Sequence, residues 1–297
     1  MKATTASYGG IELGGTKIVA AIGDASGAIT ARTTIPTGAP EQAITQIIAF
    51  FRDTGISLAG LGVGAFGPIV IDPAAADYGQ LLETNKPGWS GFNLARALTD
   101  ALDVPLRLVT DVGAAAIGEA RLGALRGAPL GIYITIGTGI GGAILAQGAI
   151  LPARLHPELG HIPLHRLPGD TAPSLCRFHD HCAEGLISGP AIKARFGREL
   201  AGADPDGPEV RLLAEYLGQL CANLALTLSP HRIVIGGGVS QVPGLLRAGQ
   251  QAMLRQLGGY ATGASDDPAF LCAPALGQDA GITGALLLGA EAAAPRS

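Results

Sequence analysis

Two stretches of the chain share one pattern of apolar residues around a glycine-rich turn. In the first, apolar runs flank Gly14-Gly15-Thr16-Lys17, and in the second they flank Gly137-Thr138-Gly139-Ile140-Gly141-Gly142. Short apolar runs that are bounded by glycine are typical of β-strands. We therefore expect one β-hairpin at residues 8–23 and another at residues 131–146, one in each half of the chain.

Strand and helix patterns alternate along the rest of the chain. Apolar strands are expected at 60–66, 106–110 and 232–235, and helices at 40–51, 190–199 and 209–228, with an Ala-rich helix opening at Asp111. Such alternation predicts an α/β fold. We expect two domains, residues 1–117 and 118–297, with the last helix able to pack back on the first domain.

Composition narrows the class of protein. Of 297 residues, 47% are hydrophobic and 15% are charged, with a mean hydropathy of +0.35, so a large buried core is expected. The 20 basic and 24 acidic side chains give a net charge of −4 without a basic run, which argues against a nucleic-acid partner. No apolar run is long enough for a membrane span, and the N-terminus lacks a signal-peptide pattern. We expect a soluble cytoplasmic protein with no membrane partner.

The glycine turns could bind phosphate groups. A turn without side chains lets backbone N–H groups approach an anion, and Lys17 adds a positive charge at the first turn. A tight hairpin that requires positive φ is the alternative explanation of any single Gly-Gly pair. A third cluster, Gly236-Gly237-Gly238, follows another expected strand, and three such loops favour a nucleotide as the ligand.

Two other nucleotide-binding motifs do not fit. A Walker-type loop is absent from the sequence. The pattern Gly-x-Gly-x-x-Gly does occur at Gly137, Gly139 and Gly142, and it would suggest a dinucleotide-dependent oxidoreductase. That fold needs a helix next and an acidic residue about 20 positions later. Here Gln147-Gly148 interrupts the following stretch, and the nearest candidate, Glu158, lies beside Pro157.

Histidine and cysteine are concentrated in one irregular segment. Five of the six histidines lie between His156 and His181, together with Cys176 and Cys182. His161, Cys176, His179 and Cys182 would supply four nitrogen and sulfur ligands, which suits tetrahedral zinc. From the spacing alone, a pair of reduced cysteines near loop histidines is an equal alternative.

Several motifs together resemble those of one family, the ROK sugar kinases. In chain order they lie at residues 11–17, 110–119, 136–142, 156–162, 176–185 and 228–239. Glu12, the string Gly64-Ala65-Phe66-Gly67-Pro68 and the spacing Cys-x-x-His-x-x-Cys are most similar to the bacterial fructokinase branch. The resemblance implies an actin-like ATPase fold, a duplicated ribonuclease H-like architecture in which the nucleotide lies between two α/β domains. It also implies a homodimer.

The resemblance places the catalytic base at Asp111. Phosphoryl transfer to a sugar hydroxyl requires a group that accepts the hydroxyl proton, and a carboxylate at a strand-to-helix junction suits that role. From the residues alone, Asp111 could equally be the N-cap of the helix that it opens.

The remaining site residues also follow from the resemblance. For ATP, with Mg²⁺ bridging its phosphate oxygens, they are Gly14, Gly15, Thr16, Lys17, Gly137, Thr138, Gly139, Gly141, Gly236, Gly237 and Gly238. For the sugar they are Phe66, Gly67, Pro68, Lys86, Thr110, Glu158, His161 and Glu184. For a structural Zn²⁺ they are His161, Cys176, His179 and Cys182.

The activity implied is ATP-dependent phosphorylation of a hexose, with fructose converted to fructose 6-phosphate. Glucokinase or mannokinase activity and a non-catalytic sugar sensor on the same scaffold are the alternatives. Two positions depart from the family pattern. Gly113 stands where the family usually has Asn, and Thr84-Asn85-Lys86 replaces the usual Thr-Pro-Lys of fructokinases.

Overall fold

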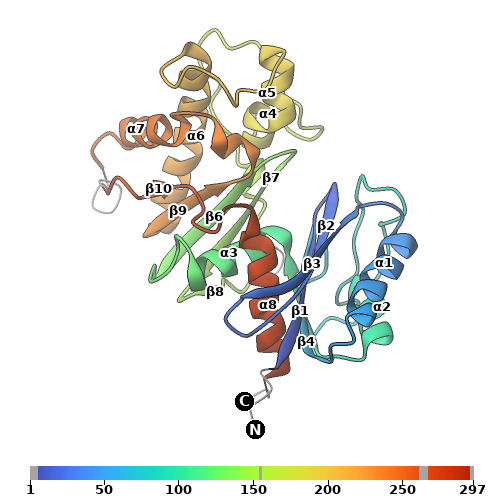
Figure 1. Cartoon of the computed structure of the whole chain (residues 1–297). Helices are drawn as coiled ribbons and strands as arrows, with labels where there is room; N and C mark the ends of the chain where they lie inside the picture. Colours follow the sequence, from blue (N-terminus) through green and yellow to red (C-terminus); the bar gives the residue numbers. More distant parts are fainter. Residues whose placement is uncertain (1–5, 154–155, 261–266, 295–297) are drawn as a thin grey trace. The chain divides into compact units, whose positions relative to one another are not determined.

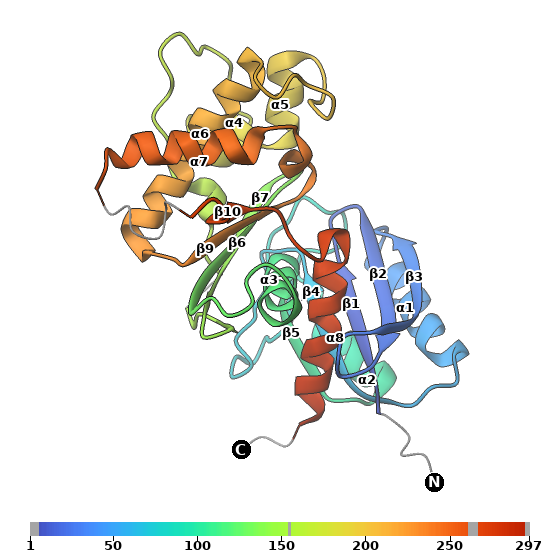
Figure 2. The same ribbon diagram turned by 60° about the vertical axis from the view of Figure 1, so that its left-hand side comes forward.

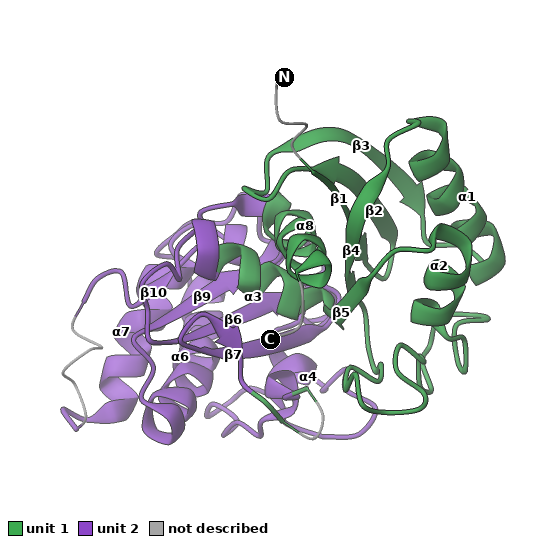
Figure 3. Ribbon diagram, turned by 90° about the horizontal axis from the view of Figure 1, so that it is seen from below, with its two compact units in different colours: residues 1–119, 152–156, 279–297 green, residues 120–151, 157–278 purple. Residues whose placement is uncertain are grey.

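The computed structural model describes residues 6–153, 156–260 and 267–294 (Figure 1). Their contacts divide the chain into two compact units, which Figure 3 colours separately. Unit 1 comprises residues 1–119, 152–156 and 279–297, and unit 2 comprises residues 120–151 and 157–278. The C-terminal helix therefore belongs to the unit that contains the first hairpin.

Unit 1 is built on a five-stranded mixed sheet in the order β3-β2-β1-β4-β5. The antiparallel strands are β1 (Ser7–Leu13), β2 (Lys17–Gly23) and β3 (Ile29–Pro36), and β4 (Leu58–Ala65) and β5 (Leu106–Thr110) run parallel to β1. The first hairpin predicted from the sequence is the β1–β2 pair, in which Leu13 pairs with Ile18.

Helices cover both faces of this sheet because the strands are apolar on both sides. On one face, Ile18, Ala20 and Ile22 share a core with α1 (Pro40–Asp53) and α2 (Leu94–Leu102). On the other face, Val19 and Ala21 pack against α8 (Ala280–Ala293), which Figure 2 shows alongside β1 and β4. A Cβ at Gly62 would lie 1.9 Å from the carbonyl oxygen of Ala285, so glycine is what lets β4 contact this helix closely.

Unit 2 repeats the same strand pattern. Its sheet has the order β10-β9-β6-β7-β8, in which β6 (Leu130–Ile136), β7 (Ile140–Ala146) and β8 (Ala149–Ile150) are antiparallel. The strands β9 (Arg232–Gly236) and β10 (Leu271–Cys272) are parallel to β6. The second predicted hairpin is the β6–β7 pair, and each unit thus has three antiparallel strands followed by two parallel ones.

The helices of unit 2 share one large core. They are α4 (Ala183–Ile187), α5 (Gly189–Phe196), α6 (Pro208–Leu228) and α7 (Leu245–Leu257). The helix α3 (Asp111–Leu122) belongs to unit 1 up to Glu119. The short 3₁₀ turns are η1 (Leu159–His161), η2 (Gly238–Gln241) and η3 (Gly277–Asp279). The fully buried Tyr216 of α6 is among the largest side chains of this core.

Two of the expected elements illustrate how their boundaries differ in the structure. The helix expected at 190–199 ends at Phe196, because Gly197 adopts φ 71° and its N–H bonds back to the carbonyl of Lys193. The strand expected at 60–66 begins earlier, at Leu58, and ends at Ala65. Among the described helices, none combines the length and apolar character that a membrane span needs.

Candidate active site

The first glycine turn joins β1 to β2 and is closed by backbone hydrogen bonds. The Gly14 N–H donates to the Lys17 carbonyl at 3.1 Å, and the Thr37 hydroxyl donates to the Gly14 carbonyl at 2.8 Å. Neither Gly14 nor Gly15 has positive φ, so the positive-φ explanation of this turn is wrong. A Cβ at Gly15 would lie 3.1 Å from Cε and 3.3 Å from Nζ of Lys86. Lys86, which was expected to contact the sugar, therefore lies beside the first glycine turn.

The second glycine turn, between β6 and β7, is held by α4 and α5. The Gly189 N–H at the start of α5 donates to the Gly137 carbonyl at 2.7 Å, and the Ile140 N–H donates to Oε2 of Glu184 at 2.9 Å. Glu184, another expected sugar residue, is thus placed against the turn, where a Cβ at Gly139 would lie 2.8 Å from its carboxylate oxygen.

At two glycines of the expected nucleotide loops, nothing in the fold itself requires the absence of a side chain. A Cβ at Gly137 or at Gly238 would meet no atom within 4 Å, and neither residue has positive φ. Their neighbour Gly237 is different, because it has φ 82° and a Cβ there would lie 2.4 Å from the carbonyl oxygen of Ile136. Open space above a bare backbone suits a ligand that approaches the peptide N–H groups closely.

Asp111 stands at the junction of β5 and α3, but it does not cap the helix. The Gly113 N–H donates to Oγ1 of Thr110 at 3.0 Å, so Thr110 is the N-cap, whereas Asp111 Oδ1 accepts the N–H of the adjacent Val112 at 2.8 Å. A Cβ at Gly113 would lie 3.0 Å from that Thr110 oxygen, a tight contact that glycine avoids. Thr110 therefore fills the N-cap role, which was the alternative to the catalytic role expected for Asp111.

The charge on Asp111 is set by burial and by its neighbours. Burial raises the pKa of this carboxyl, while hydrogen bonds from the N–H groups of Val112 and Asp111 itself and the charge of His156 lower it, and the net shift is upward. Glu12, half-buried on β1, has its pKa raised to about 7, chiefly by burial and next by the charge of Asp111. Unit 1 therefore places two carboxyl groups with raised pKa values within electrostatic reach of each other.

The expected sugar wall at Phe66-Gly67-Pro68 is a packed turn with a cis peptide bond between Gly67 and Pro68. The buried Phe66 ring lies edge-on to Trp89, with 5.6 Å between the ring centroids. A Cβ at Gly67 would lie 3.3 Å from both Cε1 and Nε2 of His156. The sequence analysis did not predict this contact, because no periodicity in the loop places a histidine on that turn.

Glu158 and His161, two residues expected to contact the sugar, lie at η1 in unit 2. Glu158 is exposed and precedes η1, and its carbonyl accepts the N–H of His161 at 3.0 Å. His161 is half-buried and also belongs to the cysteine and histidine group. The structure therefore brings Phe66, Gly67 and Pro68 together with His156 in unit 1, and Glu184 together with the second glycine turn in unit 2.

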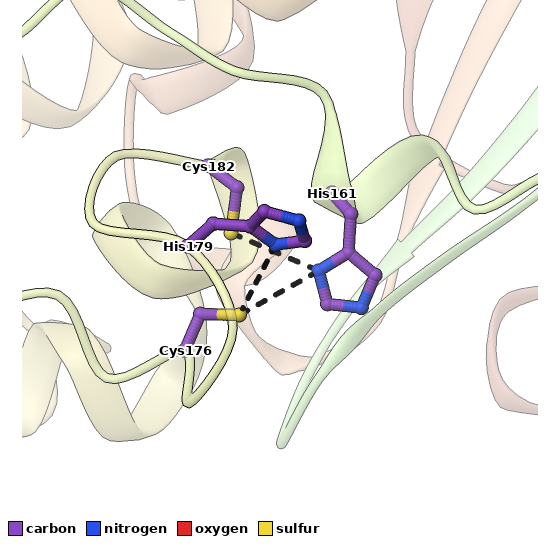
Figure 4. Close-up of side chains that lie close together, drawn as sticks. All are labelled: His161, Cys176, His179 and Cys182. Carbon is purple, nitrogen blue, oxygen red and sulfur yellow. Dashed lines mark hydrogen bonds between the residues drawn. The ribbon is translucent and has the colours of Figure 1, made fainter.

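His161, Cys176, His179 and Cys182 converge on one point (Figure 4). Cys176 Sγ lies 3.7 Å from His161 Nδ1 and 3.6 Å from His179 Nδ1, Cys182 Sγ lies 3.8 Å from His161 Nδ1, and all four ligand atoms lie within 4.8 Å of one another. Tetrahedral zinc with the usual Zn–S and Zn–N bond lengths requires sulfur-to-nitrogen distances of about 3.6 Å. Chemistry and geometry of the donor set thus both fit Zn²⁺.

The backbone supports this donor set. The Phe178 N–H donates to Cys176 Sγ at 3.4 Å, and the Gly185 N–H donates to Cys182 Sγ at 3.4 Å. Such bonds stabilise negative charge on sulfur. Exposed His181 is not one of the four.

A buried ionic cluster holds the loop that leads to Cys176. Asp170 bonds to Arg195 of α5 and to the Tyr216 hydroxyl of α6, and the side chains of Asp170 and Arg195 are only 5% and 6% exposed. Burial alone would raise the pKa of Asp170, but the bonds from Arg195 and Tyr216 outweigh it and lower that pKa to about 2. No local sequence pattern predicts this cluster, because Asp170, Arg195 and Tyr216 lie far apart in the chain.

Comparison with known proteins agrees with this architecture. The ROK family model matches residues 8–292. A fructokinase of Pediococcus pentosaceus is 38% identical over 280 residues, which cover 94% of this chain and 96% of the relative. The crystal structure of a ROK hexokinase from Thermus thermophilus has a TM-score of 0.77 at 29% identity, covering 96% of this chain and 98% of that one.

A ROK family glucokinase from Streptomyces griseus, solved in complex with glucose and AMPPNP, has a TM-score of 0.75 at 26% identity and covers 96% of this chain and 99% of its own. The two repeated mixed sheets are those of the actin-like ATPase fold of these sugar kinases, so the fold predicted from the motifs is confirmed. This chain belongs to the ROK family.

Proposed function

We propose that this protein transfers the γ-phosphoryl group of ATP to a hydroxyl of a hexose, and that its preferred acceptor is fructose, which becomes fructose 6-phosphate. The observation that carries the proposal is the capping of α3 by Thr110, which leaves the Asp111 carboxyl at the strand end for chemistry. The printed activities of the relatives, fructokinase in Pediococcus pentosaceus and hexokinase in Thermus thermophilus, support the same reaction class.

In this mechanism Asp111 accepts the proton of the attacking hydroxyl as the new oxygen–phosphorus bond forms and the bond between the γ-phosphorus and the oxygen of the leaving ADP breaks. A carboxyl group can do so only when ionised. The two backbone N–H groups that donate to Asp111 stabilise that ionised form and also hold the carboxyl in one orientation. The charge of His156 also lowers the pKa of Asp111.

The glycine turns would hold the phosphates of ATP. Gly14 to Lys17 and Gly137 to Gly141 offer backbone N–H groups, and Lys86 over Gly15 offers a second cation beside Lys17. Gly236 to Gly238 would lie near the adenosine. Mg²⁺, when bound, would neutralise negative charge that develops on the phosphates during transfer.

For the sugar we propose two sets of contacts. Phe66, Gly67, Pro68 and Thr110 in unit 1 would provide one wall, and Glu158, His161 and Glu184 in unit 2 would read the hydroxyl groups, because carboxylate and imidazole groups can accept from or donate to them. We also propose that Zn²⁺ binds at His161, Cys176, His179 and Cys182, where it would fix the ring of His161. A homodimer and a cytoplasmic location complete the proposal.

The test is an ADP-release assay with ATP, Mg²⁺ and fructose, mannose or glucose in turn. The proposal predicts the highest kcat/KM for fructose. A preference for glucose would make the protein a glucokinase and would overturn the choice of acceptor. Calorimetric binding of a hexose without ADP release would identify a sugar sensor, and it would overturn the proposed activity altogether.

A further inference from the structure

Ile140 stands where the second glycine turn passes into β7, and two other elements of unit 2 hold it there. Its N–H donates to Oε2 of Glu184 on α4 at 2.9 Å. Its carbonyl oxygen lies against η1, because a Cβ at Gly160 would come within 2.2 Å of that oxygen. All of these residues belong to unit 2. The end of the turn is therefore fixed on both sides of one residue by segments that follow it in the chain.

The position of Glu184 is itself fixed by its short helix. Cys182 is the N-cap of α4, and its Sγ accepts the Gly185 N–H at 3.4 Å. The Ala183 N–H donates to the carbonyl of Ile162, the residue after η1, at 3.1 Å. A hydrogen bond thus joins α4 to the end of η1, and these are the two elements that contact the turn. The side chain of Glu184 extends from a fixed backbone rather than from a free loop.

The charge of Glu184 is wrong for direct contact with a phosphate group. A Cβ at Gly139 would lie 2.8 Å from its Oε2, so the carboxylate lies against the turn itself. A negative group at this place repels an anion. The same oxygen, as an acceptor, holds one peptide N–H of the turn in place. Charge and geometry therefore assign opposite effects on phosphate binding to this side chain, and the two can be measured separately.

We propose that Glu184 is a positioning residue for the nucleotide, which sets the conformation of the second glycine turn through Ile140 in addition to contacting the sugar. This inference rests on the proposed binding of ATP phosphates at that turn. A carboxylate has two acceptor oxygens, so Oε2 holds the turn while Oε1 is the acceptor for a sugar hydroxyl. A preorganised turn loses less conformational freedom when it binds phosphate. The bond to Ile140 therefore strengthens nucleotide binding even without sugar.

The experiment measures binding of AMPPNP with Mg²⁺ by calorimetry, in the absence of sugar, to the wild type, Glu184→Asp, Glu184→Gln and Glu199→Gln. Asp keeps the charge but is one methylene shorter, so it withdraws the acceptor from the Ile140 N–H. Gln keeps the reach and an acceptor oxygen but removes the charge. Glu199 is exposed in unit 2 and lies outside the helices, so its variant controls for the loss of one negative charge.

We expect Glu184→Asp to bind AMPPNP about tenfold more weakly than the wild type, because one hydrogen bond to a charged acceptor is lost. Glu184→Ala, which has no acceptor, should weaken binding to a similar extent, so the prediction does not depend on the folding of a single variant. Glu184→Gln should bind at least as tightly as the wild type, and Glu199→Gln should match it. Hydrogen exchange of the Ile140 amide, which needs no ligand, should be faster in Glu184→Asp and unchanged in Glu184→Gln.

Wild-type affinity in Glu184→Asp and Glu184→Ala would show that the side chain serves the sugar alone, and it would overturn the inference. Equal weakening in Glu184→Asp and Glu184→Gln would also overturn it, because the loss would not follow the reach of the acceptor. Either result leaves the proposed function intact if the wild type releases ADP with fructose. A wild type that neither binds AMPPNP nor releases ADP would overturn the function and this inference together.

Discussion

Glu12 offers a quantitative test of the electrostatics in unit 1. Its carboxyl group lies against the first turn of α8, where a Cβ at Gly281 would come within 2.5 Å of its carboxyl carbon. Burial is the largest cause that raises its pKa from 4.5 to about 7, and Asp111 adds to it, while Lys17 and Arg32 act in the opposite direction. Replacement of Glu12 by Gln removes the titration and keeps the shape of the side chain.

The sign follows from the direction of the shift. A carboxyl with a raised pKa in the folded state destabilises the fold once it must ionise, so the protein loses stability as pH rises from about 4.5 through about 7. The full shift corresponds to about 3 kcal/mol, of which about 2.5 kcal/mol develops between pH 5 and pH 8. Glu12→Gln should therefore gain about 2.5 kcal/mol relative to the wild type over this interval.

The assay is urea unfolding of the wild type, Glu12→Gln and Glu83→Gln at pH 5, 6, 7 and 8. Glu83 is exposed in the same unit, so its variant controls for the loss of one negative charge. The difference in unfolding free energy between Glu12→Gln and the wild type should grow steadily with pH. A difference that is the same at pH 5 and pH 8 would show that Glu12 titrates normally, and it would refute the reasoning.

Three further predictions concern packing and the metal. Gly281→Ala should lower the thermal midpoint because Glu12 must move, even though Ala favours helix over Gly by about 1 kcal/mol. Gly202→Ala is the control, because its new Cβ would meet no atom within 4 Å, and it should keep the wild-type midpoint. Equal midpoints for the two variants would contradict the contact between Glu12 and Gly281. In urea unfolding, Asp170→Asn should lower the unfolding free energy by about 3–5 kcal/mol, because it leaves Arg195 charged and buried. The double variant Asp170→Leu with Arg195→Met should recover much of this loss, because it removes the buried charge. Elemental analysis should find one zinc per chain in the wild type and in His181→Asn, but none in His179→Asn; zinc retained by His179→Asn would contradict the proposed ligand set.

The repeated hairpins were predictable because their signal is local. Apolar runs around Gly14-Gly15 and around residues 137–142 mark a strand, a turn and a strand within a short window, and the structure forms β1–β2 and β6–β7 there. The grouping of His161, Cys176, His179 and Cys182 was predictable for a similar reason, because three of these residues lie in the short pattern from Cys176 to Cys182. The resemblance of the motifs to one family supplied the fold that joins these pieces.

What could not be predicted depends on contacts between distant positions. Nothing near His156 in the sequence indicates that it packs on Gly67, and nothing near Asp170 indicates a bond to Arg195 and Tyr216. The cap at Thr110 was also hidden, because Thr and Asp are both good N-cap residues and only the hydrogen bond to Gly113 distinguishes them. The backbone conformation of the first glycine turn was also left open by the sequence, and only the structure shows that Gly14 and Gly15 do not have positive φ.

The most direct test of the account is the turnover of Asp111→Asn with saturating ATP, Mg²⁺ and fructose. Asp103→Asn is the matched control, because Asp103 is exposed, ends α2 at φ 51° and can be replaced by Asn, which tolerates this conformation. If Asp111 accepts the hydroxyl proton, its variant should lose roughly 10²–10⁴-fold in kcat, while Asp103→Asn keeps the wild-type value. An Asp111→Asn protein that folds and turns over at the wild-type rate would contradict the central claim.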